Sequence, residues 1–497
     1  MTKYNFFKIQ CTPAYLWISA VLILSACILF GSLIFGSHVW LDEIYTISEI
    51  SIPYLELLQI LTTDVHPPLY FVGLKVFCDI FGYNLIVMHI FSLLAILGMF
   101  AIGFFPVRHA FGEKTSLWFM FLCLTMPCMM WYSNEIRMYS WAMFFVTACC
   151  LSAIRVFQSG KLSAWICFVL FGIFASYTHN YALMGIGLIV LSLGMYMWLK
   201  KREDIKKWIL ASGIIGVAYI PWFVTLLGQV SGVNDGFWIT FNLNTLLGIP
   251  FGIFTLHSQF TILNAFFIGF IGIISLYFLH RLFTTKPWTE KEWISLACVL
   301  IISLILIFTI GYSIIIQPVV QARYIMTLFG LGLLFFSIML SSIQNRKLVV
   351  IFVCVMIGAT GIGYCSNYLY EYNTDMVNAI SQIDEKYPPN AIFIYDGGHA
   401  FGVMGHYLPE RVHLTVATPE GVINHNTVYT KLLNGKAVTP DKISEYLSGE
   451  KSIYLIEVNE GEVQPILSDS FNVNFVENIS SPLDSNYKLW SIYSVNQ

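Results

Sequence analysis

The strongest constraint on this chain is a series of long apolar runs that recurs from residue 14 to residue 368. A helix that crosses a bilayer needs roughly 20 apolar residues, with a range of about 17–25. About eleven runs meet this requirement. They lie near 14–36, 85–106, 115–132, 138–157, 162–178, 182–199, 207–228, 259–280, 293–316, 322–342 and 347–368. Only 11% of the residues are charged, against about 25% in soluble domains. We therefore predict a polytopic α-helical membrane protein.

A shorter apolar stretch, 68–81, follows Pro67 and Pro68. Two prolines suit the start of a helix, and we predict that this helix dips into the outer leaflet and returns. With this choice, the basic residues gather on one side of the membrane. They lie in the N-terminus with Lys3 and Lys8 and in the segments 108–114, 155–161, 200–207, 280–291 and 346–347. The positive-inside rule makes that side, and the N-terminus, cytoplasmic.

The opposite, extracytoplasmic side then receives several loops and the C-terminal tail. The loops are 37–84, with a short amphipathic helix near 52–58, and 133–137, 178–181, 229–258 and 317–321. The tail is polar and mixes β-prone runs (391–395, 452–458 and 489–495) with helical ones (376–386 and 441–447). We predict a transmembrane domain over 1–369 and a small soluble α/β domain over 370–497. The net charge of −3 gives no sign of a nucleic-acid partner.

Two polar motifs stand in the first outer loop. Asp42 and Glu43 follow the first apolar run, and a partly desolvated carboxylate near a bilayer can act as a general base. Asp64 and His66 precede the double proline, which would hold them at the membrane surface. There they could orient an acceptor or bind a divalent metal. The alternatives are solvated loop acids and, for His66, a helix-entry turn with a solvated histidine.

Further polar residues lie at the outer ends of later spans. Arg137 and Arg323, with Tyr139 and Tyr324 nearby, could grip a phosphate through their planar guanidinium groups. The alternative is snorkelling to lipid headgroups, although the positive-inside rule disfavours basic residues on this side. His179 opens a short polar turn, which suits a structural role as well as a substrate contact. In the tail, the spacing of His399, His406 and His413 is too loose to predict a metal site.

These motifs resemble those of membrane glycosyltransferases with the C-type fold. The likeness is greatest to the branch that contains the dolichyl-phosphate-mannose protein mannosyltransferases and the bacterial lipid A aminoarabinose transferase. It covers roughly residues 1–345, whereas the tail matches no pattern of that branch. The segments that carry it are Asp42-Glu43, 64–70, 132–139, 177–181 and 322–324.

The resemblance implies transfer of a hexose or pentose from a polyprenyl monophosphate to an acceptor hydroxyl, with inversion. Asp42 would be the catalytic base, with Glu43, Asp64 and His66 supporting it or positioning the acceptor. The phosphate would be held by Arg137, Arg323 and Tyr324, and Glu135, Tyr139 and His179 would also bind substrate. Some relatives have lysine in place of His66. The loop 229–258, with Trp238, could cover the lipid.

The resemblance leaves other partners open. The acceptor could be a protein, a lipid or a glycan, no cofactor is certain, and a divalent metal stays possible. The protein would reside in the plasma membrane, in contact with its lipids.

Other classes of protein also have many spans. A transporter is expected to show broken helices, repeats and polar groups at mid-bilayer, whereas the charged residues here lie at the ends of the runs. A polysaccharide polymerase or ligase would use a diphosphate-linked donor. A receptor-like scaffold would leave the acidic loop and the arginine turns unexplained.

Overall fold

The computed structural model describes residues 11–36, 39–232, 241–256, 261–284, 286–372, 375–396, 398–418, 421–422, 433, 435–447, 452–457, 463–480 and 488–496. Lys3, Lys8 and Trp238 lie outside these residues. The chain forms two compact units. The helical unit comprises Met1–Phe35 and Leu58–Tyr368, and the sheet unit comprises Gly36–Leu57 and Leu369–Gln497. The segment that carries Asp42 thus groups with the C-terminal residues.

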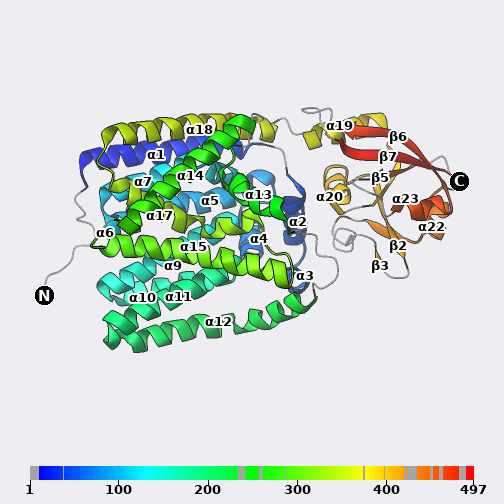
Figure 1. Ribbon diagram of the computed structural model, residues 1–497. Coiled ribbons are helices and arrows are strands. Elements are labelled where there is room, and N and C mark those ends of the chain that lie inside the picture. The colour runs from blue at the N-terminus through cyan, green and yellow to red at the C-terminus, as the bar shows by residue number, and fades with distance from the viewer. Residues whose placement is uncertain are drawn as a thin grey trace. The chain divides into compact units, whose positions relative to one another are not determined.

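The helical unit consists almost entirely of helices, most of them apolar (Figure 1). They are α1 (Pro13–Leu33), α4 (Leu69–Phe81), α5 (Leu85–Ile102), η1 (Gly103–Val107), α6 (Arg108–Phe111), α7 (Glu113–Thr125), α8 (Pro127–Asn134), α9 (Tyr139–Ser159), α10 (Leu162–Ser176), α11 (Asn180–Lys200), η2 (Arg202–Asp204), α12 (Ile205–Gly232), α13 (Leu243–Phe254), α14 (Thr261–Thr284), α15 (Glu290–Ile315), α16 (Ala322–Ile325), η3 (Met326–Leu328), α17 (Phe329–Ser341) and α18 (Arg346–Tyr372). In the described part of the chain, nine helices are long and apolar enough to cross a membrane, or ten with the bent pair α7 and α8. The prediction of a polytopic helical membrane protein is confirmed.

Two segments differ from the sequence prediction. The run 115–132 is broken into α7 and α8, which meet at 65°. Pro127 occupies the first turn of α8, and a proline cannot donate the backbone hydrogen bond that would continue α7. The predicted loop 229–258 contains the last turn of α12 and the twelve-residue helix α13. Asn242 caps α13 by accepting from the Thr245 N–H, a helix-start signal that the sequence already contains.

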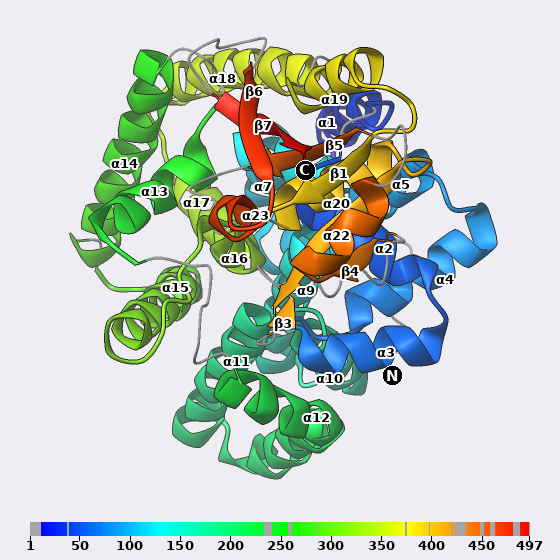
Figure 2. The same cartoon turned by 90° about the vertical axis from the view of Figure 1, so that its right-hand side faces the viewer.

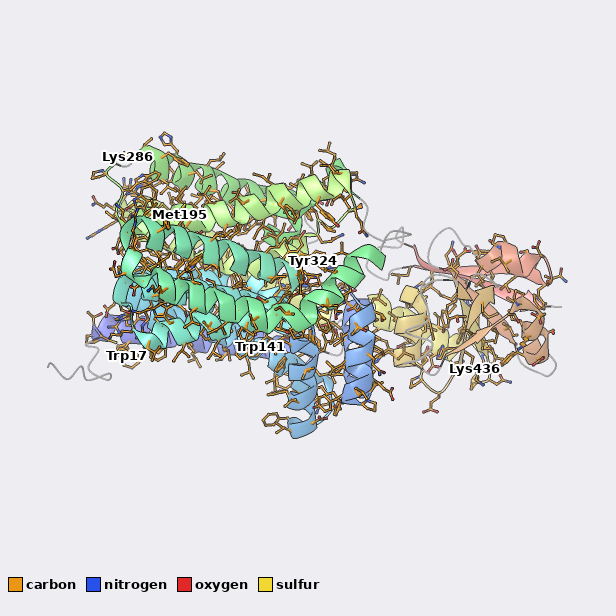
Figure 3. All side chains as sticks on the ribbon, turned by 90° about the horizontal axis from the view of Figure 1, so that it is seen from below. Trp17, Trp141, Met195, Lys286, Tyr324 and Lys436 are labelled. Atoms are coloured by element: carbon orange, nitrogen blue, oxygen red, sulfur yellow. The ribbon has the colours of Figure 1, made fainter. Side chains whose placement is uncertain are left out.

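Basic side chains tie several loops together at one end of the helical unit. Lys201 donates to the carbonyl of Phe157, Lys291 to that of Phe111, and Lys114 to that of Ile343. Cations near helix C-termini satisfy carbonyls that lack a partner within the helix. Figure 3 shows Lys286 at this end and Tyr324 near the other. The predicted division of the basic loops from the polar motifs is therefore present in the structure.

The sheet unit has an α/β architecture. Its helices are α2 (Leu41–Ser51), α19 (Asp375–Lys386), α20 (Gly398–Tyr407), α22 (Pro440–Leu447) and α23 (Val463–Ser468), while α3 (Tyr54–Thr63) runs across the residues of both units. Its strands are β1 (Ile392–Tyr395), β2 (Val412–Thr418), β3 (Gly421–Val422), β4 (Lys436–Val438), β5 (Ile453–Glu457), β6 (Asn472–Ser480) and β7 (Lys488–Asn496). The strand order is β3-β2-β1-β5-β7-β6, with β4 also pairing with β2. Strands β1, β2, β4 and β5 are parallel, and β6 and β7 complete the sheet as an antiparallel pair.

Hydrophobic residues of the strands and of two helices form the core of the sheet unit. Ile392, Leu414 and Leu455 come from the strands, Ile443 from α22 and Leu467 from α23. Figure 2 shows these two helices beside the strands. The predicted elements near 376–386, 391–395, 441–447, 452–458 and 489–495 are confirmed as α19, β1, α22, β5 and β7.

Candidate functional site

The polar motifs of four separate segments meet at one end of the helical unit. The backbone N–H of Leu69 donates to the carbonyl of Tyr177 over 3.0 Å. The side-chain amide of Asn180 donates to the carbonyl of Val65, also over 3.0 Å. These two bonds bracket the double proline, which has one backbone N–H fewer at each position. They fix the segment 64–69 against the turn between α10 and α11.

Asp64, His66 and Arg137 form a hydrogen-bonded relay. Nδ1 of His66 lies 2.7 Å from Oδ2 of Asp64, and its Nε2 lies 3.4 Å from Nη2 of Arg137. A guanidinium has only donors, so Nε2 of His66 must be the acceptor and Nδ1 carries the hydrogen that Asp64 accepts. His66 therefore links a carboxylate to a guanidinium.

The groups of this relay shift the pKa of Asp64 and of the neighbouring His179. Burial alone would raise the pKa of the Asp64 carboxyl, but its interactions with His66 outweigh burial and lower that pKa below its usual value. Burial lowers the pKa of His179 well below its usual value, and electrostatic interactions with His66, Arg137 and Arg323 lower it further. His179 is therefore neutral. Because its Nδ1 accepts the N–H of Tyr181 over 3.0 Å, its Nε2 carries the hydrogen and is a donor.

Aromatic rings surround His179. The ring centroid of His179 lies 5.2 Å from that of Tyr324, 5.7 Å from that of Tyr139 and 6.2 Å from that of His66. The guanidinium carbon of Arg323 lies 5.8 Å from the ring centroid of its neighbour Tyr324. Aromatic side chains supply rigid apolar surface with a polar tip, which suits a site for a ligand with both polar and apolar parts.

Glu135 and Arg137 are both buried, with 6% and 3% of their surfaces exposed. The Arg137 N–H donates to the Glu135 carbonyl over 2.8 Å, which tightens the turn after α8. The Glu135 carbonyl also accepts from the Ser92 hydroxyl, and the neighbouring carbonyl of Asn134 accepts from the His89 ring. A buried arginine at this turn is not a residue that snorkels to lipid.

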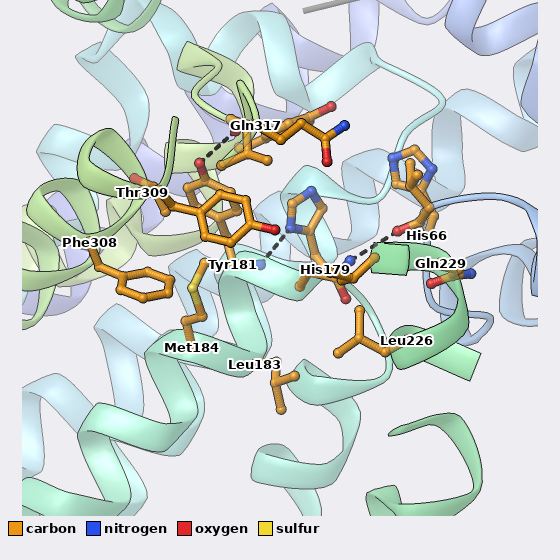
Figure 4. A pocket seen from close by; sticks show the side chains of 16 residues that line it. His66, His179, Tyr181, Leu183, Met184, Leu226, Gln229, Phe308, Thr309 and Gln317 are labelled. Atoms are coloured by element: carbon orange, nitrogen blue, oxygen red, sulfur yellow. Dashed lines mark hydrogen bonds between the residues drawn. The ribbon is translucent and has the colours of Figure 1, made fainter. Parts of the chain in front are cut away.

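A cavity of about 370 Å³ opens beside this cluster. Its polar edge is formed by His66, His179, Asn180, Gln317 and Tyr324. Its other walls are largely apolar and come from α11, α12 and α15, with Leu183, Met184, Leu226, Val230, Phe308, Thr309 and Tyr312 among the lining residues. Figure 4 shows His179 between Tyr181 and His66, facing the cavity. Such a cavity suits a ligand with one polar end and one apolar end.

Some lining residues were not predicted from the sequence. Gln229, Gln317 and Thr309 belong to this group, whereas Tyr181, which also lines the cavity, lies in the predicted polar turn. The amide of Gln229 donates to the carbonyl of Leu61, and the Tyr181 hydroxyl to that of Val319. The available signal was a polar residue inside or at the end of an otherwise apolar run, which in a membrane helix usually faces the bundle interior.

Asp42 and Glu43 lie in the first turn of α2, in the sheet unit. Oε2 of Glu43 accepts the N–H of Trp40 over 3.1 Å, so this side chain closes the start of the helix. Glu43 is buried, with 4% of its surface exposed, whereas Asp42 is partly exposed.

We searched the described residues for side chains that could bind a metal ion together. They contain no group of three or more histidine, cysteine, aspartate or glutamate side chains that could hold a metal ion. Asp64 and His66 are bonded to each other instead. In the tail, His413 lies buried between the Tyr395 hydroxyl and the Leu408 carbonyl.

No protein-family model matches the sequence, and no curated protein matches it at a significant level. Among solved structures, the chain is similar to ArnT from Cupriavidus metallidurans in the apo state, with a TM-score of 0.62 and 12% identity over 97% of this chain and 98% of that one. It is also similar to the same protein bound to undecaprenyl phosphate, with a TM-score of 0.58, 12% identity and the same coverage. At this identity the likeness concerns the fold, and it confirms the predicted C-type glycosyltransferase fold.

Proposed function

We propose that this protein is a membrane glycosyltransferase that moves a sugar from a polyprenyl monophosphate to an acceptor hydroxyl. The observation that carries the proposal is that His66, His179 and Tyr324 line the polar edge of a largely apolar cavity. Behind them, the buried guanidinium of Arg137 contacts the ring of His66. A donor of this class has the same division, because its anionic phosphate and sugar are joined to a long apolar chain. The fold shared with ArnT, which has been solved with undecaprenyl phosphate bound, points to the same donor.

We assign the phosphate to the basic side of the cluster. Arg137 and Arg323 both act on His179 electrostatically, so their guanidinium groups bring two positive charges to one place. Guanidinium groups bind phosphate oxygens through paired donors. The Nε2–H of neutral His179 would add a donor that carries no charge.

We assign the proton transfer to Asp42. In the reaction, the Asp42 carboxylate takes the proton of the acceptor hydroxyl. At the same time, the oxygen of that hydroxyl forms a bond to the anomeric carbon. The bond from that carbon to the phosphate oxygen breaks, and the polyprenyl phosphate leaves with the electron pair. Attack opposite the leaving group inverts the anomeric centre. The charge that develops on the phosphate is stabilised by the arginines. Asp42 is the more suitable acid of the pair because the Glu43 carboxylate caps the helix.

The two ends of the helical unit suggest an orientation. The end rich in lysine and arginine would face the cytoplasm, by the positive-inside rule, and the cluster end would face the opposite side. The N-terminus would then be cytoplasmic. The transmembrane domain 1–369 would bind the donor, and residues 370–497 would form the extracytoplasmic domain. The sugar would be a hexose or a pentose, and the acceptor a protein, lipid or glycan.

The test is sugar transfer by the full chain in native membranes, with a panel of radiolabelled undecaprenyl-phosphate sugars as donors. We expect wild-type protein to transfer label from at least one donor and Asp42→Asn to transfer none at equal expression. Glu56→Gln is the matched control, because Glu56 is an exposed acid of the same loop. Equal transfer by wild type and Asp42→Asn would remove Asp42 from the mechanism. No transfer from any monophosphate donor, but transfer from a diphosphate-linked donor, would favour a polymerase or ligase.

A further inference from the structure

The helix that carries Asp42 is packed on a helix of the C-terminal domain. Helix α2 contacts α20 within the sheet unit. The contact includes hydrogen bonds to the chain just before α2. The Tyr407 hydroxyl, at the end of α20, accepts the backbone N–H of Val39 over 3.0 Å. The same hydroxyl donates to the Val39 carbonyl over 3.5 Å. One side chain thus binds both polar groups of a single residue of the main chain.

Val39 is the residue that fixes how the chain enters α2. It precedes the N-cap Trp40 by one position, and Ile44 lies four positions into the helix. Val39 and Ile44 are both fully buried. Apolar residues at these two positions commonly form a hydrophobic staple, which sets the entry angle of the chain. Together with the Glu43 bond to the Trp40 N–H, the Tyr407 hydroxyl leaves the first turn of α2 little freedom.

We propose that Tyr407 is a positioning residue for catalysis, and that the C-terminal domain serves to hold the helix that presents the catalytic acid. The inference rests on the proposed function of Asp42, which lies three residues after Val39 in the same first turn. Tyr407 makes no contact with substrate in this scheme. Its hydroxyl acts through Val39 on the direction of the Asp42 side chain. A displacement of about 1 Å in a catalytic group can lower a rate by about 100-fold.

Tyr407 bonds to the main chain of Val39 and not to its side chain. A substitution of Val39 would leave both backbone groups in place, whereas Tyr407→Phe removes only the hydroxyl that binds them. The phenylalanine ring retains the shape that packs edge-on against His406, whose ring centroid is 5.0 Å away. Tyr407→Phe therefore separates the positioning bond from the packing of α20.

A matched control is available in the same unit. The Tyr387 hydroxyl donates to the Glu477 carboxylate over 2.5 Å and so also makes one strong hydrogen bond of the C-terminal domain. Its partner is on β6 rather than near α2. Tyr387→Phe thus reports what the loss of a hydroxyl does to the domain without a change at the start of α2.

The experiment measures hydrogen–deuterium exchange and transfer kinetics on the full-length variants, with the donor that the wild type accepts from the undecaprenyl-phosphate panel. In Tyr407→Phe we expect faster exchange in peptides covering 39–46, and a kcat lower by about tenfold with an unchanged KM for the donor. In Tyr387→Phe we expect faster exchange near residues 387 and 477, with kcat unchanged.

The outcomes separate this inference from the proposed function. Unchanged exchange over 39–46 in Tyr407→Phe, or faster exchange there with a wild-type kcat, would overturn the positioning role. Equal losses of kcat in both variants would also overturn it, because a general loss of domain stability would then be sufficient. If Asp42→Asn transferred sugar as well as the wild type, the proposed base would fail whatever Tyr407→Phe did. An inactive Asp42→Asn together with a fully active Tyr407→Phe would refute only the positioning role of Tyr407.

Discussion

The relay from Asp64 through His66 to Arg137 predicts that Asp64→Asn disables the phosphate site without unfolding the protein. The Asp64 carboxylate fixes the hydrogen of His66 on Nδ1, which leaves Nε2 as the acceptor for Arg137. An asparagine in this place can turn its amide donors toward Nδ1. The hydrogen of His66 would then move to Nε2 and oppose the N–H of Arg137, so the guanidinium would lose its hydrogen bond to His66.

The size of the effect follows from the burial of the pair. The side chains of Asp64 and His66 are only 14% and 12% exposed, so solvent screens their bond weakly. A hydrogen bond to a charged group contributes about 1.5–3 kcal/mol. Since about 1.4 kcal/mol corresponds to a factor of ten, the loss should lower kcat/KM for the donor by roughly 10- to 100-fold.

Transfer kinetics in membranes with equal amounts of each variant measure this loss. Asp79→Asn is the control, because Asp79 is an exposed aspartate on α4 whose carboxylate accepts the Tyr83 hydroxyl. A kcat/KM for Asp64→Asn within about twofold of the wild type would refute the relay. So would a loss that Asp79→Asn reproduces.

Acid should weaken the same bond, and the sign follows from the pKa. The pKa of Asp64 is lower in the folded protein than its ordinary value of 3.8. Its contribution to stability is therefore complete above that value and is lost as the pH falls through the folded pKa. The difference in Tm between wild type and Asp64→Asn should be largest near neutral pH and shrink below about pH 4. A difference that grows in acid would contradict the assignment of charge.

Two further substitutions test the cavity and the packing beneath it. Leu226→Trp should lower transfer by roughly tenfold or more, because the larger ring fills a cavity that must admit the lipid. Leu227→Trp should leave transfer unchanged, since Leu227 is 55% exposed on the outer face of α12; equal losses would place the lipid elsewhere. Gly330→Ala should destabilise the helical unit by about 1–3 kcal/mol, because the added Cβ would lie 1.8 Å from Oγ1 of Thr147. Gly332→Ala, whose nearest neighbour would be 3.9 Å away, is the control in thermal unfolding, and equal Tm values would refute the packing argument.

The convergence of the polar motifs could be predicted because a membrane reduces topology to a choice between two faces. Once the spans are counted, Asp64, Arg137, His179 and Tyr324 must lie at the same end. The structure confirms this through the bonds of His66 and the rings around His179. The helix after the double proline was predictable for a similar reason, since prolines favour the first turn and 68–81 is too short to cross the bilayer.

The cavity wall could not be predicted, because the spans that form it are apolar on every side. Leu226 lines the cavity while the adjacent Leu227 is exposed, and nothing in the two residue types separates them. The period of a helix reveals a buried face only when the other face is polar. The same limit applies to Thr309 and Phe308, which also line the cavity. Only packing between helices decides which side of such a span faces inward.

The grouping of α2 with the C-terminal residues was also beyond the sequence. Asp42 and Asp64 share one loop, and nothing in the spacing separates them. The structure places Leu41–Ser51 in a unit with residues more than 300 positions later, through contacts such as the Tyr407 bond to Val39 (368 positions apart). Pairings of this kind depend on the tertiary fold, since no local propensity favours them.

His66 also bears on the source of the positive charge in the proposed phosphate site. A lysine at this position would bring a mobile positive charge directly to the proposed phosphate site. His66 cannot do so while it accepts from Arg137 and donates to Asp64. The Asp64 carboxylate and the His66 ring instead orient the Arg137 guanidinium, and in the proposed site the positive charge comes from Arg137 and Arg323. The proposed reaction therefore does not require a lysine at this position, because a guanidinium held in place can supply the positive charge.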